Sequence, residues 1–136
     1  MYDIYYAHHQ WKYGTFEEAY EISLIKRYFP NANIFNPATD LTTIPSANEM
    51  VIMNECLNAV RNSDILVFSS LDGCVGTGVF HEVKEAMSKG KIVFYIYQDK
   101  LIADFEIIER EEAEKTDRLY AFVERRKYEK VYRART

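Results

Sequence analysis

The sequence Ser63-Asp64-Ile65-Leu66-Val67-Phe68 is followed, after two serines, by Leu71-Asp72-Gly73-Cys74-Val75-Gly76-Thr77-Gly78-Val79-Phe80-His81-Glu82. The prediction of the fold starts from these two stretches. The first is continuously apolar after its Asp, which is typical of a strand covered on both faces in a parallel sheet. The second predicts a loop over residues 70–77 and a helix over residues 78–89. Gly90 is the expected C-terminal glycine of that helix, and residues 91–97 form the next apolar run. This order predicts an α/β sheet.

The same alternation extends to both sides. We expect strands at Asp3–Ala7, at residues 32–35 and, as the fifth strand, at residues 101–108. Capping boxes at Thr15–Glu18 and Ser46–Glu49 predict helices that end near Phe29 and Asn62. The predicted apolar stripe of the first helix consists of Ala19, Ile22, Ile25 and Phe29. We therefore predict a mainly parallel sheet of about five strands with right-handed crossovers.

The length and the net charge of the chain exclude several classes of protein. A chain of 136 residues favours one domain over residues 1–136, and its net charge of −4 argues against a binder of nucleic-acid polymers. No apolar run approaches the roughly 18 residues of a membrane span, so we expect no membrane partner. The N-terminus lacks a signal-peptide pattern, and Cys56 and Cys74 are interpreted as free thiols, which together predict a cytoplasmic location. Three histidines without ligand spacing predict no metal site.

The end of the chain differs in charge from the rest. Residues 1–108 carry a net charge of −6, whereas residues 109–136 carry +2. We expect a charged helix from about residue 109, beginning between Glu111 and Asp117, followed by a basic tail. The tail is interpreted as a solvated helix end or, alternatively, as an arm that contacts a partner or attracts phosphate.

Candidate site residues follow the predicted strands, because α/β sheets bind ligands beyond the carboxyl ends of their strands. Three segments lie there: 7–13, 36–45 and 70–77. Glu82, about one turn into the helix that follows, is placed to reach such a cleft with its carboxylate. The alternative is that Glu82 only complements the helix dipole.

The spacing around Glu82 resembles that of the nucleoside 2-deoxyribosyltransferase superfamily, which includes the 2'-deoxynucleoside 5'-monophosphate N-glycosidases. Asp64 opens the strand, Gly78 stands four residues before Glu82 and Ala86 four after it, and Gly90-Lys91 follows. Ile4-Tyr5-Tyr6-Ala7 and Glu55-Cys56-Leu57-Asn58 are similar to two further segments of the superfamily. The resemblance covers roughly residues 2–97.

The resemblance implies a flavodoxin-like three-layer sandwich that cleaves or transfers at the N-glycosidic bond of a nucleoside or nucleoside 5'-monophosphate. It implies that Glu82 is the nucleophile, attacking the anomeric carbon to form a glycosyl-enzyme. No cofactor or metal is implied. The expected substrate-binding residues are Tyr5, Ala7, His8, Lys12, Cys56, Asp72, Gly76, Thr77 and Gly78.

Some of these residues have a plainer interpretation. Residues 8–13 are equally well a polar surface loop, and Cys56 is equally well a buried structural thiol. If Lys12 and the neighbouring histidines meet a phosphate, the substrate is a nucleotide.

The sequence departs from the superfamily at two positions. Cys56 stands where the superfamily usually has Asp, and Gly76 stands where it often has Asp or Ser, although Asp72 or Thr77 is near enough to fill that space. These departures motivate an alternative function, a non-catalytic module that senses or sequesters a nucleotide in the same cleft. A phosphoribohydrolase of the lysine-decarboxylase-like type is a weaker alternative, because Glu82 follows Thr77 by five residues rather than three.

The resemblance also implies a homodimer or higher homo-oligomer, in which the C-terminal part of a neighbour completes the pocket. Tyr120, Tyr128 and Tyr132 suit such a contact, since tyrosine is common at interfaces.

Overall fold

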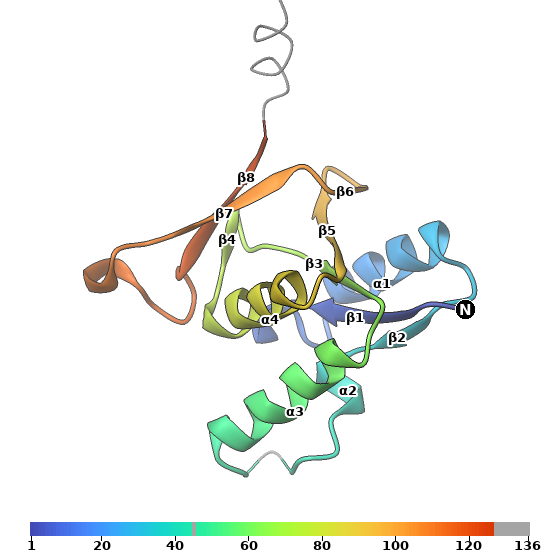
Figure 1. Ribbon diagram of the computed structural model, residues 1–136, viewed down its shortest axis with the longest axis horizontal. Helices are drawn as coiled ribbons and strands as arrows, with labels where there is room; N and C mark the ends of the chain where they lie inside the picture. Colours follow the sequence, from blue (N-terminus) through green and yellow to red (C-terminus); the bar gives the residue numbers. More distant parts are fainter. Residues whose placement is uncertain (45, 127–136) are drawn as a thin grey trace, which may run out of the picture.

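The computed structural model describes residues 1–44 and 46–126, which fold around a five-stranded sheet (Figure 1). The strand order is β2 (Asn33–Phe35), β1 (Asp3–Ala7), β3 (Ile65–Phe68), β5 (Ile92–Tyr97) and β6 (Lys100–Ile102). The first four strands are parallel, and β6 pairs antiparallel with β5. The prediction of a mainly parallel sheet of about five strands is confirmed.

Helices cover both faces of this sheet, as in a three-layer flavodoxin-like sandwich. Helix α1 (Phe16–Tyr28) packs on one face, and α3 (Glu49–Arg61) and α4 (Thr77–Ser88) pack on the other (Figure 1). Successive residues of β1 belong to the cores on opposite faces of the sheet, because side chains in a strand point alternately to the two faces. Ile4 and Tyr6 join the core on the α1 side, whereas Tyr5 and Ala7 join the core on the α3 and α4 side.

A second, three-stranded sheet lies beside the first. Its order is β4 (Cys74–Val75), β8 (Ala121–Arg125) and β7 (Phe105–Glu109), and both pairings are antiparallel. The predicted loop over residues 70–77 therefore contains a short strand, and the predicted strand over residues 101–108 divides between β6 and β7. This sheet closes over the start of α4 (Figure 1).

The helix predicted from about residue 109 is wrong for the described residues. Strand β7 ends at Glu109, a 3-10 turn η2 occupies Glu112–Glu114, and β8 follows. The strand is favoured because Ala121 and Val123 alternate into the core, a period of two that the charged residues before them obscure. The basic tail over residues 127–136 lies outside the described residues.

The helix ends follow the capping predictions in part. The Thr15 hydroxyl accepts a hydrogen bond from the Glu18 amide at 3.2 Å, but the Glu18 carboxylate binds the Gly14 amide rather than that of Thr15. Asn48, not Ser46, caps α3. Two shorter helices lie at strand ends, η1 (Gln10–Lys12) after β1 and α2 (Pro37–Asp40) after β2. No helix in the described part of the chain is long and apolar enough to cross a membrane.

Candidate functional site

Glu82 is a buried carboxylate at the carboxyl end of the main sheet. Helix α4 begins at Thr77, so Glu82 lies in its second turn, with 5% of its surface exposed. The Tyr5 hydroxyl, from the face of β1 toward α4, donates a hydrogen bond to Glu82 Oε2. Burial raises the pKa of Glu82 to about 7, and hydrogen bonds with Tyr5 and Cys56 oppose this shift. Among the described residues, no cation lies within ion-pair distance of Glu82.

The groups that contact Glu82 are weak acids that stay protonated. Burial and the charge of Glu82 raise the pKa of the Tyr5 hydroxyl far above its ordinary value. Burial raises the pKa of the Cys56 thiol to about 11. The Tyr5 ring also stacks on Phe35 of β2, with centroids 5.5 Å apart. Near neutral pH the hydroxyl and the thiol are therefore both protonated, and the Tyr5 hydroxyl donates to the Glu82 carboxylate.

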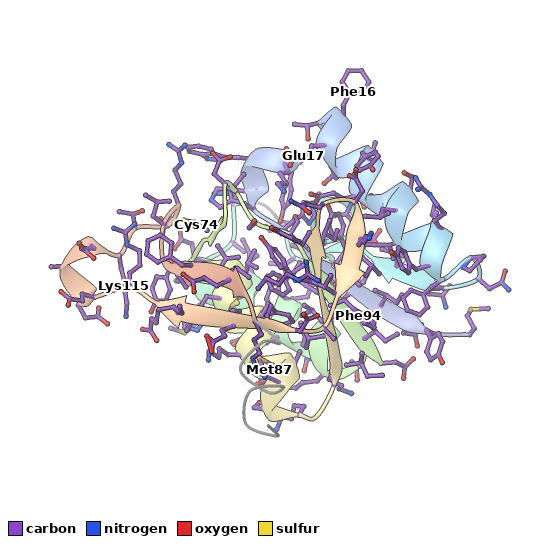
Figure 2. All side chains as sticks on the ribbon, turned by 90° about the horizontal axis from the view of Figure 1, so that it is seen from above. Phe16, Glu17, Cys74, Met87, Phe94 and Lys115 are labelled. Atoms are coloured by element: carbon purple, nitrogen blue, oxygen red, sulfur yellow. The ribbon has the colours of Figure 1, made fainter. Side chains whose placement is uncertain are left out.

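A second polar cluster lies on the other face of β1, against α1. The Lys12 ammonium is 2.9 Å from Glu21 Oε2, 3.0 Å from Ser69 Oγ and 2.8 Å from the Ser70 carbonyl oxygen. It also contacts Glu17, the second residue of α1, next to the projecting Phe16 (Figure 2). Lys12 is only 2% exposed, so its ammonium group contacts protein oxygens instead of solvent.

His8 extends this cluster toward the start of α1. Its Nε2 is 2.6 Å from Glu18 Oε2, and its Nδ1 is 3.2 Å from the carbonyl oxygen of Tyr6, on whose ring it stacks. Burial lowers the pKa of His8, and the hydrogen bond to Glu18 opposes that shift. Burial works to raise the pKa of Glu18, but the hydrogen bonds from His8 and Gly14 outweigh it and lower that pKa.

Tyr13 lies between the two clusters. Its ring is 4.9 Å from that of His8, centroid to centroid. Burial raises the pKa of Tyr13, and the charge of Glu82 adds to the shift, which places the phenol within the electrostatic field of that carboxylate. Tyr13 is 39% exposed, so it forms part of the surface beside Glu82.

The start of α4 is covered by the connection between β7 and β8. A side chain at Gly76 would place its Cβ 2.1 Å from the carbonyl oxygen of Asp117 and 3.0 Å from the His9 ring. The Thr77 hydroxyl donates to Asp117 Oδ1 at 3.3 Å. Close approach of another backbone therefore explains the glycine at position 76. At Gly78 a Cβ would only touch Met53 at 3.6 Å, an ordinary contact.

The structure brings some predicted site residues together and separates others. Tyr5, Cys56 and Glu82 are in contact, with Ala7 buried at the end of the same strand. Gly76, Thr77 and Gly78 form the start of α4. Lys12 and His8 lie on the opposite face of β1, and Asp72 is on a surface turn with φ of +50°.

Sequence reasoning missed Glu18, Glu21 and Asp117. Glu18 and Glu21 are buried on α1 beside Leu24, whereas Ala19, which the predicted stripe included, is exposed. The spacing of Glu18, Glu21 and Leu24 along one helix face was an available signal. Tyr120, predicted for a subunit contact, packs within the chain against Phe80, with centroids 4.9 Å apart. Tyr128 and Tyr132 lie outside the described residues.

Comparisons with known proteins bear on the fold. No family model and no curated protein matches the chain. Among solved structures, a 2-deoxyribosyltransferase from Leishmania mexicana aligns with a TM-score of 0.50 and 15% identity, over 89% of this chain and 78% of that one. The chain has a deoxyribosyltransferase-like fold. A conserved protein from Enterococcus faecalis V583 aligns with a TM-score of 0.59 and 22% identity, over 70% of this chain, which spans 62% of that protein.

Within this deoxyribosyltransferase-like fold, hollows lie away from Glu82. A cavity of about 480 Å³ lies between the edge strand β2 and α3, where Asp3, Phe35, Glu55 and Asn58 are among its lining residues. Glu55 is held there by the amides and hydroxyls of Thr42 and Thr43, which lower its pKa to about 2. In residues 1–44 and 46–126, no three His, Cys, Asp or Glu side chains are grouped to hold a metal ion.

Proposed function

We propose that this protein cleaves or transfers at the N-glycosidic bond of a nucleoside or nucleoside 5'-monophosphate, with Glu82 as the nucleophile. The observation that carries the proposal is a buried glutamate at the carboxyl end of a parallel sheet, which has no cationic partner within residues 1–44 and 46–126. Ligands bind at that edge in α/β sheets. With a pKa near 7, about half of the Glu82 carboxyl groups are ionised at neutral pH, and the ionised form is the nucleophile.

In the proposed reaction the ionised Glu82 attacks the anomeric carbon of the sugar. The C–O bond of a glycosyl ester forms while the C–N bond breaks, and the electron pair leaves with the base, which takes up a proton. Water or a second base then attacks the same carbon and releases the Glu82 carboxylate. Tyr5 and Cys56 orient the carboxylate through their hydrogen bonds, and none of these steps requires a cofactor.

The second candidate is a module that binds a nucleotide without cleaving it. Two observations favour it: Glu82 is only 5% exposed, and Cys56 supplies a thiol where the resemblance expects a carboxylate. In that case Glu82 accepts a hydrogen bond from the ligand and forms no ester.

The test is release of free base from a panel of ribonucleosides, 2'-deoxynucleosides and their 5'-monophosphates, measured by chromatography with and without an added acceptor base. We expect release from at least one member and a loss of at least about 10³-fold in Glu82→Gln, because the amide is not a nucleophile. Glu85→Gln is the matched control on the same helix, where the Glu85 carboxylate pairs with Arg61 at 2.7 Å outside the site. It should keep the wild-type rate within about twofold.

A covalent step has its own signature. Rapid quenching followed by mass spectrometry of the peptide that contains Glu82 should detect the added glycosyl mass, which Glu82→Gln abolishes. Binding of a panel member by calorimetry without release of base would instead support the module.

A further inference from the structure

The connection between β7 and β8 reaches from the second sheet to the turn that leads into α4 (Figure 1). The Tyr120 amide donates to the Val75 carbonyl oxygen at 3.0 Å, and β8 continues this pairing along β4. The Asp117 carbonyl oxygen lies 2.1 Å from the position that a Cβ at Gly76 would take. The Thr77 hydroxyl donates to Asp117 Oδ1 at 3.3 Å. The connection is therefore fixed to the segment between β3 and α4.

His9 links the same connection to the loop after β1. Burial lowers the pKa of His9, so its ring is neutral at pH 7. Its Nδ1 accepts a hydrogen bond from the Trp11 amide at 3.0 Å, which caps η1 and leaves Nε2 to donate to the Asp117 backbone. The Arg118 guanidinium lies over the Trp11 ring, 4.7 Å from its centroid. The 3-10 turn η1 is thus held by the connection at two points.

The position of η1 decides where Tyr13 lies. Tyr13 directly follows η1, and its amide donates to the Gln10 carbonyl oxygen at 3.0 Å. The Tyr13 side chain is part of the surface, since the residue is 39% exposed, whereas Glu82 is buried. Burial raises the pKa of Tyr13, and the charge of Glu82 adds to the shift, so the hydroxyl is protonated at neutral pH. It is therefore a hydrogen-bond donor available to a ligand at Glu82.

The connection occupies an edge of the site that the sequence resemblance gives to a neighbouring subunit. Tyr120, which suits a subunit contact by its type, packs on Phe80 and lies 6.0 Å from the His81 ring of its own chain. The Val123 amide donates to the Gly73 carbonyl oxygen at 2.8 Å. The segments that the connection contacts follow β1 and β3, at the edge of the sheet where α/β proteins bind ligands.

We propose that the connection between β7 and β8 completes the Glu82 site within one chain, with Asp117 and His9 as positioning residues that hold η1 and Tyr13 beside the substrate. This inference rests on the proposed function. The two residues act through η1 and not on the reacting atoms, so their loss should raise KM more than it lowers kcat. Partial unfolding would do the reverse, because it only reduces the number of active molecules.

Gly76→Ala tests the contact directly, using the compound of the panel that the wild type cleaves fastest. Its methyl group collides with the Asp117 carbonyl oxygen and displaces the connection without removing a polar group. We expect KM to rise by about tenfold, with kcat within about threefold of wild type. Glu124→Ala is the control, since Glu124 is exposed on β8 opposite Glu106. It should leave both constants within about twofold of wild type.

His9→Asn tests the second contact. Asparagine keeps an acceptor for the cap of η1 but lacks the Nε2 donor to Asp117, so KM should rise by about fivefold, the effect of one hydrogen bond. In the Gly76→Ala background the same change should add less than about twofold, because the contact is already lost. Urea denaturation checks that each variant is folded. If Gly76→Ala is not folded, His9→Asn decides the test.

Coexpression separates completion within one chain from completion by a neighbour. The double variant Asp117→Ala/Arg118→Ala removes the bond to Thr77 and the contact with Trp11, and should also raise KM. It is coexpressed with Glu82→Gln, whose connection is intact but whose nucleophile is lost. We expect KM to stay raised. A return to the wild-type KM would show that the intact connection of one chain serves Glu82 of the other, which overturns the inference.

The inference and the proposed function fail in different ways. If the wild type cleaves a compound and neither Gly76→Ala nor His9→Asn raises its KM, the inference is overturned and the proposed function stands. If no compound is cleaved, dissociation constants from calorimetry replace KM for the same variants. Absence of binding to every compound of the panel overturns the inference and the proposed function together.

Discussion

Two neighbouring tyrosines of β1 each donate a hydrogen bond to a buried glutamate, on opposite faces of the sheet. Tyr5 binds Glu82, which is 5% exposed, and Tyr6 binds Glu21, which is 4% exposed. Glu21 also has an ammonium ion, that of Lys12, at 2.9 Å, whereas the donors to Glu82 in the described part of the chain are neutral. Burial is thus nearly equal, and the cation is the difference. A buried carboxylate that is paired with a cation can stay ionised as part of the fold. A buried carboxylate without a cation has a raised pKa, which is a common property of functional sites.

The largest expected effect comes from removing the cation. Lys12→Met leaves Glu21 buried with a negative charge and no ammonium partner, which should lower the free energy of unfolding by about 3–5 kcal/mol. Urea denaturation followed by fluorescence measures this. The double variant with Glu21→Gln should recover more than half of the loss, because it leaves no unpaired buried charge. Strictly additive losses would show that the two groups do not depend on each other.

The opposite effect is expected at Glu82. Its pKa is raised from the ordinary 4.5 to about 7, so the folded state holds a proton that the unfolded state releases between those values. The stability of the wild type should therefore fall as the pH rises from about 4.5 to 7 and then level off. Glu82→Gln removes that cost and should stabilise the protein by about 3 kcal/mol at pH 8.5, with little change at pH 4.5.

Glu85→Gln gives the reference for that measurement. The hydrogen bond from Arg61 lowers the pKa of Glu85, so its loss should reduce stability at neutral pH rather than increase it. Thermal unfolding of both variants at pH 4.5 and 8.5 measures the contrast. A fall in stability for Glu82→Gln at pH 8.5 would contradict the assignment of an unpaired buried charge.

The hydrogen bonds that the two tyrosines donate should have smaller effects. Tyr6→Phe removes a hydrogen bond to a charged, buried acceptor and should cost about 1–2 kcal/mol of stability. The midpoint of the pH–rate profile should not move, since Tyr6 faces away from Glu82. Urea denaturation and kcat/KM against pH measure the two effects, and a displaced midpoint would show that the faces are coupled.

Tyr5→Phe should act on titration more than on stability. The rate is expected to rise with pH through about 7, as Glu82 loses its proton. The hydrogen bond from Tyr5 lowers the pKa of Glu82, so its removal should move the midpoint upward by up to about one pH unit. The measurement is kcat/KM from pH 5 to 9 for wild type and variant. A midpoint that moves downward would contradict the assigned donor.

The main sheet was predictable because its strands are short apolar runs between glycines and helix caps. The second sheet was not: β4 has two residues, and β7 and β8 are separated by a charged stretch that resembles a helix. Their pairing depends on contacts distant in sequence, which local propensity does not report.

The residues of the candidate site also differ in how far the sequence predicts them. Glu82 was predicted as the nucleophile because its spacing from Gly78, Ala86 and Gly90 is visible in one segment, and this role stays a prediction. Lys12 and His8 were expected to face a ligand, but their buried partners Glu18 and Glu21 lie on a helix face that the predicted apolar stripe did not include. Asp117 carries no local signal, because only the folded chain brings it to Gly76.

The alternation of β1 has a consequence for how this chain tolerates change. Parallel partners on both sides hold the strand, with Tyr5 opposite Phe35 of β2 and Leu66 of β3. Inserting or deleting a single residue there would turn the side chains that follow to the opposite face of the sheet. Tyr5 and Tyr6 would then no longer face Glu82 and Glu21. The odd or even position of each tyrosine in β1 thus decides whether it binds the proposed nucleophile Glu82 or the paired carboxylate Glu21. This five-residue strand should therefore be the segment that tolerates changes of length least.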